Sequence, residues 1–337
     1  MYGHRKFPKI GGLHNVIKSV DHWAELSETS QVTLDYRAKV KLHGTNMGVR
    51  VYPNGKVIAQ SRTQDLDNDG YQFPDFVAEN QDYFQSLIGE MEALIIYGEW
   101  AGPSVQRKVS VSKIPQKAFF VFTCSIIEHG EERMVTNPTD IEALLLSNRD
   151  KLPERFHIIP WHGAPVRIVY ADKAALEKQA ADFNAAVQLV DSCDPLVQSL
   201  YNVEGPGEGL VFYPIEKTDR EEFARYAFKV KGKSHERASG GDKKARTSVP
   251  IAENVHAFVD MMVTPSRISQ GVQELFGNGP FGKAELGSLI KWVAIDVRAE
   301  GTDELEAAAL DWSQVTKLLS IRVREHYFAL LENSSNS

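Results

Sequence analysis

Strand-like alternation dominates the first part of the chain. Through residues 31–60, QVTLDYRAKVKLHGTNMGVRVYPNGKVIAQ, apolar and polar residues alternate, and Pro53-Asn54-Gly55 separates two runs rich in valine. A two-residue period places alternate side chains on the two faces of a strand, and Pro, Asn and Gly favour a tight turn. The stretch therefore predicts antiparallel strands.

Further strand-like runs occupy residues 93–102, 117–127, 207–215 and 225–232. Helical patterns lie between them. Residues 139–142 have the spacing of a capping box ahead of EALLLSNR, and residues 172–190 carry helical periodicity. Helices outside a mostly antiparallel core make an α+β fold, which is the class we expect for the first two-thirds of the chain.

The composition changes abruptly at residues 233–250, KSHERASGGDKKARTSVP. We expect a first domain over residues 1–240, a basic linker over 241–250 and a small all-α domain over 251–337. In the last of these, Thr264-Pro265 predicts a helix start and Gly277 a helix stop. Further helical stretches are expected at about 283–299, 303–311 and 312–332.

The overall composition fits an ordinary globular protein, with 42% hydrophobic residues, 25% charged residues and a net charge of −7. Cys124 and Cys193 are the two cysteines, so neither a disulfide framework nor a cysteine-based zinc site is expected. No apolar run approaches the roughly 18 residues of a membrane span. We therefore expect a cytoplasmic protein without a membrane partner.

Basic residues gather locally in spite of the acidic total. Residues 229–246 contain seven Lys or Arg against Glu236 and Asp242. Such a cluster is typical of a track for the phosphates of a polynucleotide, whose binding depends on salt. A solvated, flexible linker is the alternative interpretation.

A lysine with an unusual sequel ends the first strand-like run, in Lys41-Leu42-His43-Gly44-Thr45-Asn46. Lysine is a poor nucleophile at its ordinary pKa of about 10.4, so an enzyme that uses one must destabilise the ammonium by nearby cations, burial or a metal. Gly44 would allow close approach of a phosphate, and Asn46 offers polar contacts to a sugar or phosphate. Lys39 lies close by but lacks this sequel, and a lone strand-edge lysine is more often a surface residue.

Two carboxylates stand beside glycines where strand-like runs end or begin. Glu99 follows the apolar run ALIIYG, and Glu208 lies between Gly207 and Gly209. Two acids so placed suit a shared divalent cation with oxygen ligands. For Glu99 alone, a contact to a ribose hydroxyl and an exposed turn are equally good interpretations.

An aromatic run and a pair of lysines complete the candidates. Residues 119–122, FFVF, have the pattern of a buried strand, one face of which could stack on a purine. Lys229 and Lys231 are two residues apart in a strand-like run, so both project from one face. Two such ammonium groups repel unless they share an anion, and a triphosphate is a natural one. They would also lower the pKa of a nearby attacking lysine.

Taken in order, KLHGTN, SRT at 61–63, YGEWAG, FFVF, EGLVFY and FKVKGK resemble the nucleotidyltransferase motifs of the ATP-dependent polynucleotide ligases. The forms Lys-x-His-Gly-Thr-Asn and Gly-Glu-aromatic-Ala-Gly-Pro are similar to those of the RNA ligase 2 family, within the covalent nucleotidyltransferase superfamily. The resemblance implies an antiparallel-sheet nucleotidyltransferase (adenylyltransferase) domain with an ATP-grasp-like ligase core. Residues 262–276 also resemble part of the family's helical C-terminal appendix.

The resemblance implies that Lys41 attacks the α-phosphate of ATP, expels pyrophosphate and holds AMP as a lysyl phosphoramidate. The AMP would pass to an RNA 5′-phosphate, and an RNA 3′-hydroxyl would then attack that end to form a phosphodiester. His43 is similar to the histidine that the family uses after lysine adenylation, and Arg62 to its arginine that contacts the nucleotide and the RNA end. Asn46 is expected among the nucleotide-binding residues.

The remaining site residues also take their expected roles from the resemblance. Glu99 would bind the ribose, Phe122 would stack on adenine, and Lys229 and Lys231 would hold the nucleotide phosphates. Glu208 would support the catalytic metal, with Glu99 as a second candidate ligand. Mg²⁺ is implied, with Mn²⁺ as a substitute. The expected partners are ATP and RNA with nicked or bridged ends, and the expected state is a monomer.

Two residues depart from the family pattern: Thr123 stands where relatives often carry aspartate, and Val40 where relatives can carry glutamate. Other functions stay open. DNA ligases and capping-type guanylyltransferases usually append a β-barrel, whereas residues 251–337 have helical patterns. A non-catalytic RNA-binding protein with a ligase-like fold would not need the nucleophile and both carboxylates together.

Overall fold

The computed structural model describes residues 3–27, 32–62, 64–66, 72–103, 105, 109–146, 152–232, 251–263, 265–276, 282–300, 305 and 310–335. Contacts divide the chain into two compact units, Met1–Glu236 and Arg237–Ser337. The linker expected at 241–250 lies outside the described residues, so the domain bounds inferred from the sequence stay a prediction.

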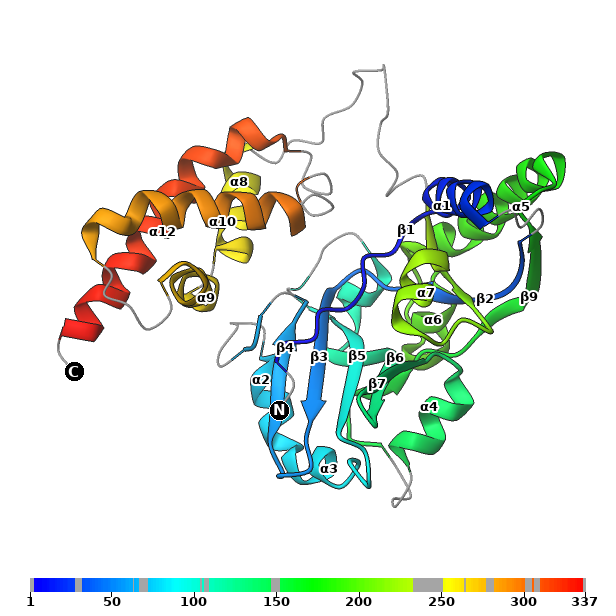
Figure 1. Ribbon diagram of the computed structural model, residues 1–337, viewed down its shortest axis with the longest axis horizontal. Helices are drawn as coiled ribbons and strands as arrows, with labels where there is room; N and C mark the ends of the chain where they lie inside the picture. Colours follow the sequence, from blue (N-terminus) through cyan, green and yellow to red (C-terminus); the bar gives the residue numbers. More distant parts are fainter. Residues whose placement is uncertain are drawn as a thin grey trace. The chain divides into compact units, whose positions relative to one another are not determined.

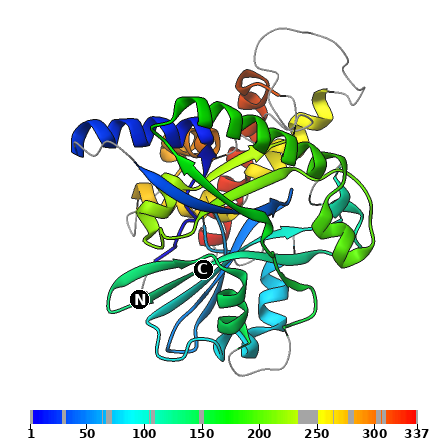
Figure 2. The same ribbon diagram turned by 90° about the vertical axis from the view of Figure 1, so that its right-hand side faces the viewer.

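Two mostly antiparallel sheets form the first unit (Figures 1 and 2). The strands are β1 (Gly11–Gly12), β2 (Thr33–Lys41), β3 (Thr45–Val51), β4 (Val57–Ser61), β5 (Ala93–Ala101), β6 (Ala118–Glu128), β7 (Glu131–Val135), β8 (Phe156–Ile158), β9 (His162–Val169), β10 (Gly209–Pro214) and β11 (Phe228–Lys231). One sheet has the order β1-β11-β10-β2-β9, and the other the order β4-β3-β5-β6-β7 with β8 beside β6. Strands β1 and β11 pair in parallel, as do β6 and β8.

Helices pack around the two sheets of the first unit. They are α1 (Leu13–Ser27), α2 (Phe73–Glu79), α3 (Gln81–Gln85), α4 (Pro138–Leu145), α5 (Lys173–Ser192), α6 (Pro195–Tyr201) and α7 (Arg220–Tyr226), with a 3₁₀ turn η1 (Ser110–Lys113). Helices α1 and α5 contact the five-stranded sheet, whereas α2 and α3 contact β4 and α4 contacts β6 and β8. Helix α7 contacts both sheets, through β10 and β7. The α+β prediction is confirmed, and α5 coincides with the helix expected over residues 172–190.

The first unit has two apolar cores, one shared by the two sheets and one on the other face of the six-stranded sheet, and β6 contributes to both. Phe120 and Phe122 belong to the core shared with the five-stranded sheet, and Phe119 and Val121 to the core under α2, α3 and α4. Strand β6 is therefore buried on both faces from Ala118 to Ile127. This explains why residues 117–127 form a continuous apolar run instead of an alternating one.

Two element boundaries differ from those expected. Helix α4 begins at Pro138, and its N-cap is Asn137, whose side chain accepts a hydrogen bond from the Thr139 backbone N–H. Thr139 is therefore inside the helix, because Asn137 followed by proline is the stronger start signal. Strand β11 begins only at Phe228, because Arg225 and Tyr226 belong to the last turn of α7, a helix whose N-cap is Asp219.

The second unit is helical. Its described elements are α8 (Ile251–Met262), α9 (Pro265–Phe276), a 3₁₀ turn η2 (Lys283–Glu285), α10 (Leu286–Glu300) and α12 (Trp312–Ser335). They enclose a separate apolar core that includes Phe258, Val293 and Tyr327. Thr264 and Gly277 lie outside the described residues, as does most of the stretch 303–311, so the expected cap, stop and helix there stay predictions.

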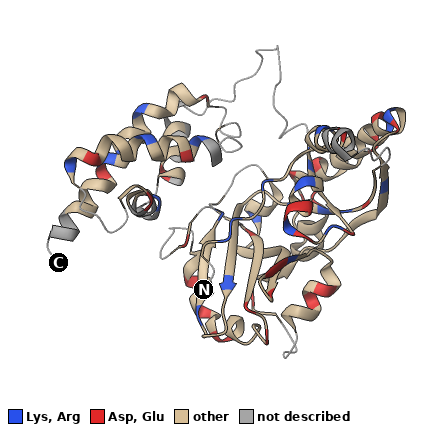
Figure 3. Cartoon of the chain, viewed as in Figure 1, with Lys and Arg blue, Asp and Glu red and all other residues tan. Residues whose placement is uncertain are grey.

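Charged residues of both signs lie along the helices of both units (Figure 3). Helix α5, for example, carries Lys173 and Lys178 together with Glu177 and Asp182. None of the helices in the described part of the chain is long and apolar enough to cross a membrane.

Candidate active site

Strand register aligns the candidate lysines on one face of the five-stranded sheet. Gly209 in β10 is the register partner of Lys41 on one side and of Lys231 on the other. Two residues along, Val211 pairs in the same way with Lys39 and Lys229. Residues directly opposite in antiparallel strands share a face. The four lysines of β2 and β11 therefore project from the same face.

Glu208 is the anion at the centre of this group. Its Oε2 lies 2.5 Å from Nζ of Lys41 and 3.4 Å from Nδ1 of His43, and its Oε1 lies 3.1 Å from Nζ of Lys231. The Glu208 side chain is 2% exposed, so one buried carboxylate serves three basic groups. The structure thus brings together four of the site residues expected from the sequence: Lys41, His43, Glu208 and Lys231. They come from segments up to 190 residues apart in the chain.

The electrostatics of Glu208 follow from this arrangement. Burial alone would raise the pKa of its carboxyl group, but Lys41, His43 and Lys231 outweigh burial and hold that pKa well below its ordinary value. Glu208 is therefore ionised at neutral pH. An ionised carboxylate with cations on both oxygens can hold a lysine in place and can also serve as an oxygen ligand for a metal ion.

Gly209 has a steric role in this arrangement. Its φ is +150°, and a Cβ there would lie 2.2 Å from the backbone oxygen of Val230 in β11. No side chain fits between β10 and β11 at this point, so glycine lets Lys41 and Lys231 approach the carboxylate of Glu208 from neighbouring strands.

We expect Gly209→Ala to lower the free energy of unfolding by about 2–4 kcal/mol, because the new Cβ must displace the β11 backbone. Urea denaturation measures this difference. Gly287→Ala is the matched control, since a Cβ at Gly287 meets nothing within 4 Å. The control is expected to be neutral or to stabilise α10 by up to about 1 kcal/mol. An unfolding free energy for Gly209→Ala within about 0.5 kcal/mol of the unmodified protein would contradict this account.

Glu99 and Asn46 lie in the second sheet and are register partners there, on β5 and β3. Oε1 of Glu99 accepts a hydrogen bond of 2.9 Å from the backbone N–H of Gly44, which fixes the loop that follows Lys41. A Cβ on Gly44 would lie 2.5 Å from the Trp100 backbone oxygen. Close packing of this loop on β5 therefore accounts for glycine at 44 without a phosphate.

Phe122 lies on β6, packed edge-on against Phe7 with ring centroids 4.9 Å apart. Arg62 follows the end of β4, and its buried Nε has no hydrogen-bond partner within the described part of the chain. Thr63, the last residue of the SRT segment, lies outside the described residues. The roles expected for Phe122 and Arg62 stay predictions.

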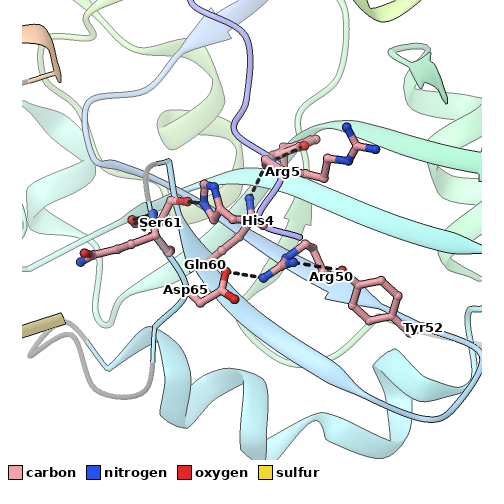
Figure 4. Close-up of polar contacts among 9 residues, drawn as sticks. His4, Arg5, Arg50, Tyr52, Gln60, Ser61 and Asp65 are labelled. Carbon is pink, nitrogen blue, oxygen red and sulfur yellow. Dashed lines mark hydrogen bonds and ion pairs between the residues drawn. The ribbon is translucent and has the colours of Figure 1, made fainter. Parts of the chain in front are cut away.

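The N-terminal segment, residues 3–10, lies on the second sheet, where His4 and Arg5 are beside Gln60 and Ser61 of β4 (Figure 4). His4 Nε2 lies 3.1 Å from the Ser61 backbone oxygen, and the Arg5 backbone oxygen accepts hydrogen bonds from Gln60 and Tyr97. These contacts bring Phe7 onto Phe122. The sequence alone carried no sign of this contribution, because nothing local in MYGHRKFPKIGG indicates which strands it crosses.

Lys39 is the other residue that sequence reasoning passed over. Its side chain is fully buried, not exposed as a strand-edge lysine would be, and its Nζ donates a 2.6 Å hydrogen bond to the Phe122 backbone oxygen. Burial lowers the pKa of Lys39 to about 7. The available clue was its two-residue spacing from Lys41, which predicts that both lie on one strand face.

The described residues do not form a preformed metal cage. Among the described residues, no group of three or more His, Cys, Asp or Glu side chains could hold a metal ion. The expectation that Glu99 and Glu208 share a cation stays a prediction. A single ionised carboxylate is still a fitting ligand for Mg²⁺, which commonly binds one or two carboxylates together with substrate phosphates.

A model of the RNA ligase family matches residues 35–231, more than half of the chain and a span that contains every candidate site residue. Among solved structures, the Naegleria gruberi RNA ligase with PPi is 16% identical to this chain, with a TM-score of 0.45. A mutant of that ligase with ATP and Mn is also 16% identical, with a TM-score of 0.46. The first match covers 69% of this chain and 57% of the Naegleria chain, and the second covers 70% and 58%. None of the curated proteins matches this sequence.

Proposed function

Because the chain belongs to the RNA ligase family, we propose that it is an ATP-dependent ligase that joins an RNA 3′-hydroxyl to an RNA 5′-phosphate through a lysyl-AMP intermediate. The observation that carries the proposal is the convergence of Lys41, His43 and Lys231 on the buried carboxylate of Glu208. Surface lysines have no need of such an arrangement. The ion pair with Glu208 fixes the orientation of Lys41, and Lys231 supplies a nearby cation, which is one of the ways in which a protein activates a lysine nucleophile.

In the first step, Nζ of Lys41 would attack the α-phosphorus of ATP. A phosphorus–nitrogen bond forms, the bond from that phosphorus to the bridging oxygen breaks, and pyrophosphate leaves. Attack requires an unprotonated amine, so the proton of Lys41 must be lost. Lys229 and Lys231 project from the face that carries Lys41 and would neutralise the phosphates, which is the main protein contribution to phosphoryl transfer.

The nucleoside would occupy the space between the two sheets. Phe122 would stack on the adenine and Glu99, beside the Gly44 backbone, would bind the ribose. Asn46, the register partner of Glu99, would add a polar contact. The buried Nε of Arg62, which has no partner in the described part of the chain, supports a contact from this residue to the nucleotide or the RNA end.

A divalent cation, Mg²⁺ or Mn²⁺, would be held by Glu208, with Glu99 as a second candidate ligand. When bound, it would neutralise phosphate charge and favour loss of the proton from Lys41. The low pKa of Glu208 supports this role, because a metal ligand must be deprotonated.

In the later steps, an RNA 5′-phosphate oxygen would attack the phosphorus of lysyl-AMP, which breaks the phosphorus–nitrogen bond and returns a proton to Lys41. The RNA 3′-hydroxyl would then attack the activated 5′-phosphate and release AMP. His43, 3.4 Å from the Glu208 carboxylate that also pairs with Lys41, would act in these steps. We propose nicked duplex or bridged RNA as the substrate and a cytoplasmic monomer as the working form.

Covalent labelling tests the proposal. The purified protein, freed of any bound AMP, is incubated with Mg²⁺ and α-labelled ATP, and in parallel with α-labelled GTP, and is then denatured. We expect label from ATP alone and sealing of a nicked duplex RNA that carries a labelled 5′-phosphate. Label from GTP alone would indicate a capping-type enzyme. No label from either nucleotide on a folded protein would refute the mechanism and favour an RNA-binding role.

A further inference from the structure

A β-bulge lies where β6 carries Phe122. In the pairing of β5 with β6, Tyr97 is opposite Thr123 and Gly98 is opposite Val121, so Phe122 is the extra residue. The bulge reverses the faces of the strand. Before it, Phe120 faces the core shared with the five-stranded sheet, whereas beyond it Cys124 and Ile126 belong to the other core. Phe122 keeps the face of Phe120, and the bulge re-aims the side chains that follow it.

Lys39 ties this bulge to the strand of the nucleophile. It donates a 2.6 Å hydrogen bond from Nζ to the carbonyl oxygen of Phe122, and Thr123 donates to the same oxygen from Oγ1 at 2.8 Å. The Lys39 side chain is 0% exposed, and its Nζ lies 4.9 Å from the ring centroid of Trp161 and 5.2 Å from that of Tyr213. An amine buried among apolar groups is costly, so its presence at this carbonyl calls for a reason.

The ring of Phe122 is held from another direction as well. Phe7, from the N-terminal segment, packs against it at a ring-plane angle of 64°. The backbone of Phe122 is thus held by Lys39 in the five-stranded sheet. The ring of Phe122 is held by the N-terminal segment, which is anchored on the six-stranded sheet. The orientation of Phe122 consequently depends on contacts that link both sheets around the nucleotide site.

We propose that Lys39 is a positioning residue that sets the orientation of Phe122 for the adenine ring of ATP. The inference rests on the proposed function, in which Phe122 stacks on the base. Lys39 and Lys41 are two residues apart on one face of β2, so the same strand that presents the nucleophile also fixes the base platform. The nucleophile Lys41 and the ring of Phe122 are thereby held at a fixed position relative to each other. In-line attack on a bound nucleotide requires such fixed geometry.

The test measures the rate of Lys41 adenylylation against ATP concentration for Lys39→Met, Phe122→Ala and the double variant. Methionine is unbranched like lysine, one atom shorter, and lacks the donor. We expect Lys39→Met to raise the KM for ATP about tenfold, as loss of base stacking would, and to change the maximal rate less than about threefold. Lys178→Met, at an exposed position of α5, is the matched control and is expected to leave both values unchanged.

The double variant separates positioning from a merely structural role. If Lys39 acts through Phe122, Lys39→Met should have almost no further effect on the KM once Phe122 is alanine. Multiplicative effects of the two substitutions, or an unchanged KM in Lys39→Met, would overturn the inference while leaving the ligase proposal intact. Absence of label on the unmodified protein would overturn both.

A second variant at position 39 distinguishes an effect on ATP binding from unfolding of the protein. Lys39→Gln retains an N–H donor, and its KM should lie between those of the unmodified protein and Lys39→Met. Both variants are expected to keep the Tm within about 5 °C of the unmodified protein, since Phe122 keeps its bond from Thr123. Unfolding of both variants at 25 °C would assign Lys39 to the fold alone and would also overturn the inference.

Discussion

Lys41→Ala is expected to abolish the label that α-labelled ATP leaves on the denatured protein, a loss of at least about 10³-fold that corresponds to some 4 kcal/mol of activation free energy. Alanine has no nitrogen to form the phosphoramidate. Lys39 cannot replace it, because its Nζ is buried against the Phe122 carbonyl. Lys41→Arg should fail almost as completely, since a guanidinium is not deprotonated in proteins.

Lys41→Ala also distinguishes self-adenylylation, the first step, from phosphodiester formation, the last step. Sealing of an RNA nick that already carries a 5′-adenylate does not need a lysine nucleophile, so Lys41→Ala should lose far less of this activity than of self-adenylylation. Lys178→Ala serves as the control in both assays. Retention of label in Lys41→Ala would show that another residue carries the AMP, and Lys231, 3.1 Å from Glu208, would be the next to examine.

Glu208→Gln is expected to lower self-adenylylation at least about 100-fold and the free energy of unfolding at pH 7 by about 3–5 kcal/mol. Glutamine preserves the shape of the side chain but removes the charge that Lys41, His43 and Lys231 share. The ammonium groups of Lys41 and Lys231 would then repel each other across a neutral amide. Urea denaturation measures the stability, and Glu204→Gln, on an exposed residue four positions earlier, is the matched control.

The pH dependence of this difference has a defined sign. The pKa of Glu208 lies well below its ordinary value of 4.5, because the three basic groups outweigh the effect of burial. The native state therefore binds fewer protons than the unfolded state as the pH falls below 4.5. The stability that the ionised carboxylate contributes is fully present above pH 4.5 and is lost as the pH falls toward the lower, folded pKa. The gap between Glu208→Gln and the unmodified protein should narrow over that range, and a gap that is constant from pH 7 to pH 3 would contradict the charge-sharing account.

Much of the site could be predicted from local patterns. The two-residue period around Lys229 and Lys231 predicts that they share a strand face, and β11 has that form. The glycines beside Glu208 were expected where a strand begins, and β10 begins at Gly209. These predictions hold because side-chain alternation and steric freedom are properties of a few neighbouring residues.

What local patterns could not predict is which lysine would be buried. Lys39 and Lys41 lie two residues apart on the same strand. Lys39 is enclosed by Trp161 and Tyr213 and donates a hydrogen bond to Phe122. Lys41 instead donates a hydrogen bond to Glu208. Their environments come from segments that lie more than 80 residues away in the chain. The burial of a side chain depends on which distant elements pack on it, and a single strand carries no record of them.

The sequence by itself determined the strand and helix pattern, the chemical types of the site residues and their order along the chain, because each of these is set within a window of a few residues. The tertiary structure alone decided the rest. Pairing of β10 with both β2 and β11 brings Glu208 between Lys41 and Lys231, and the bulge in β6 moves Cys124 and Ile126 to the face opposite Phe122. The N-terminal segment reaches Phe122 through Phe7. Each of these depends on the free energy of packing distant segments together, which only the assembled cores supply.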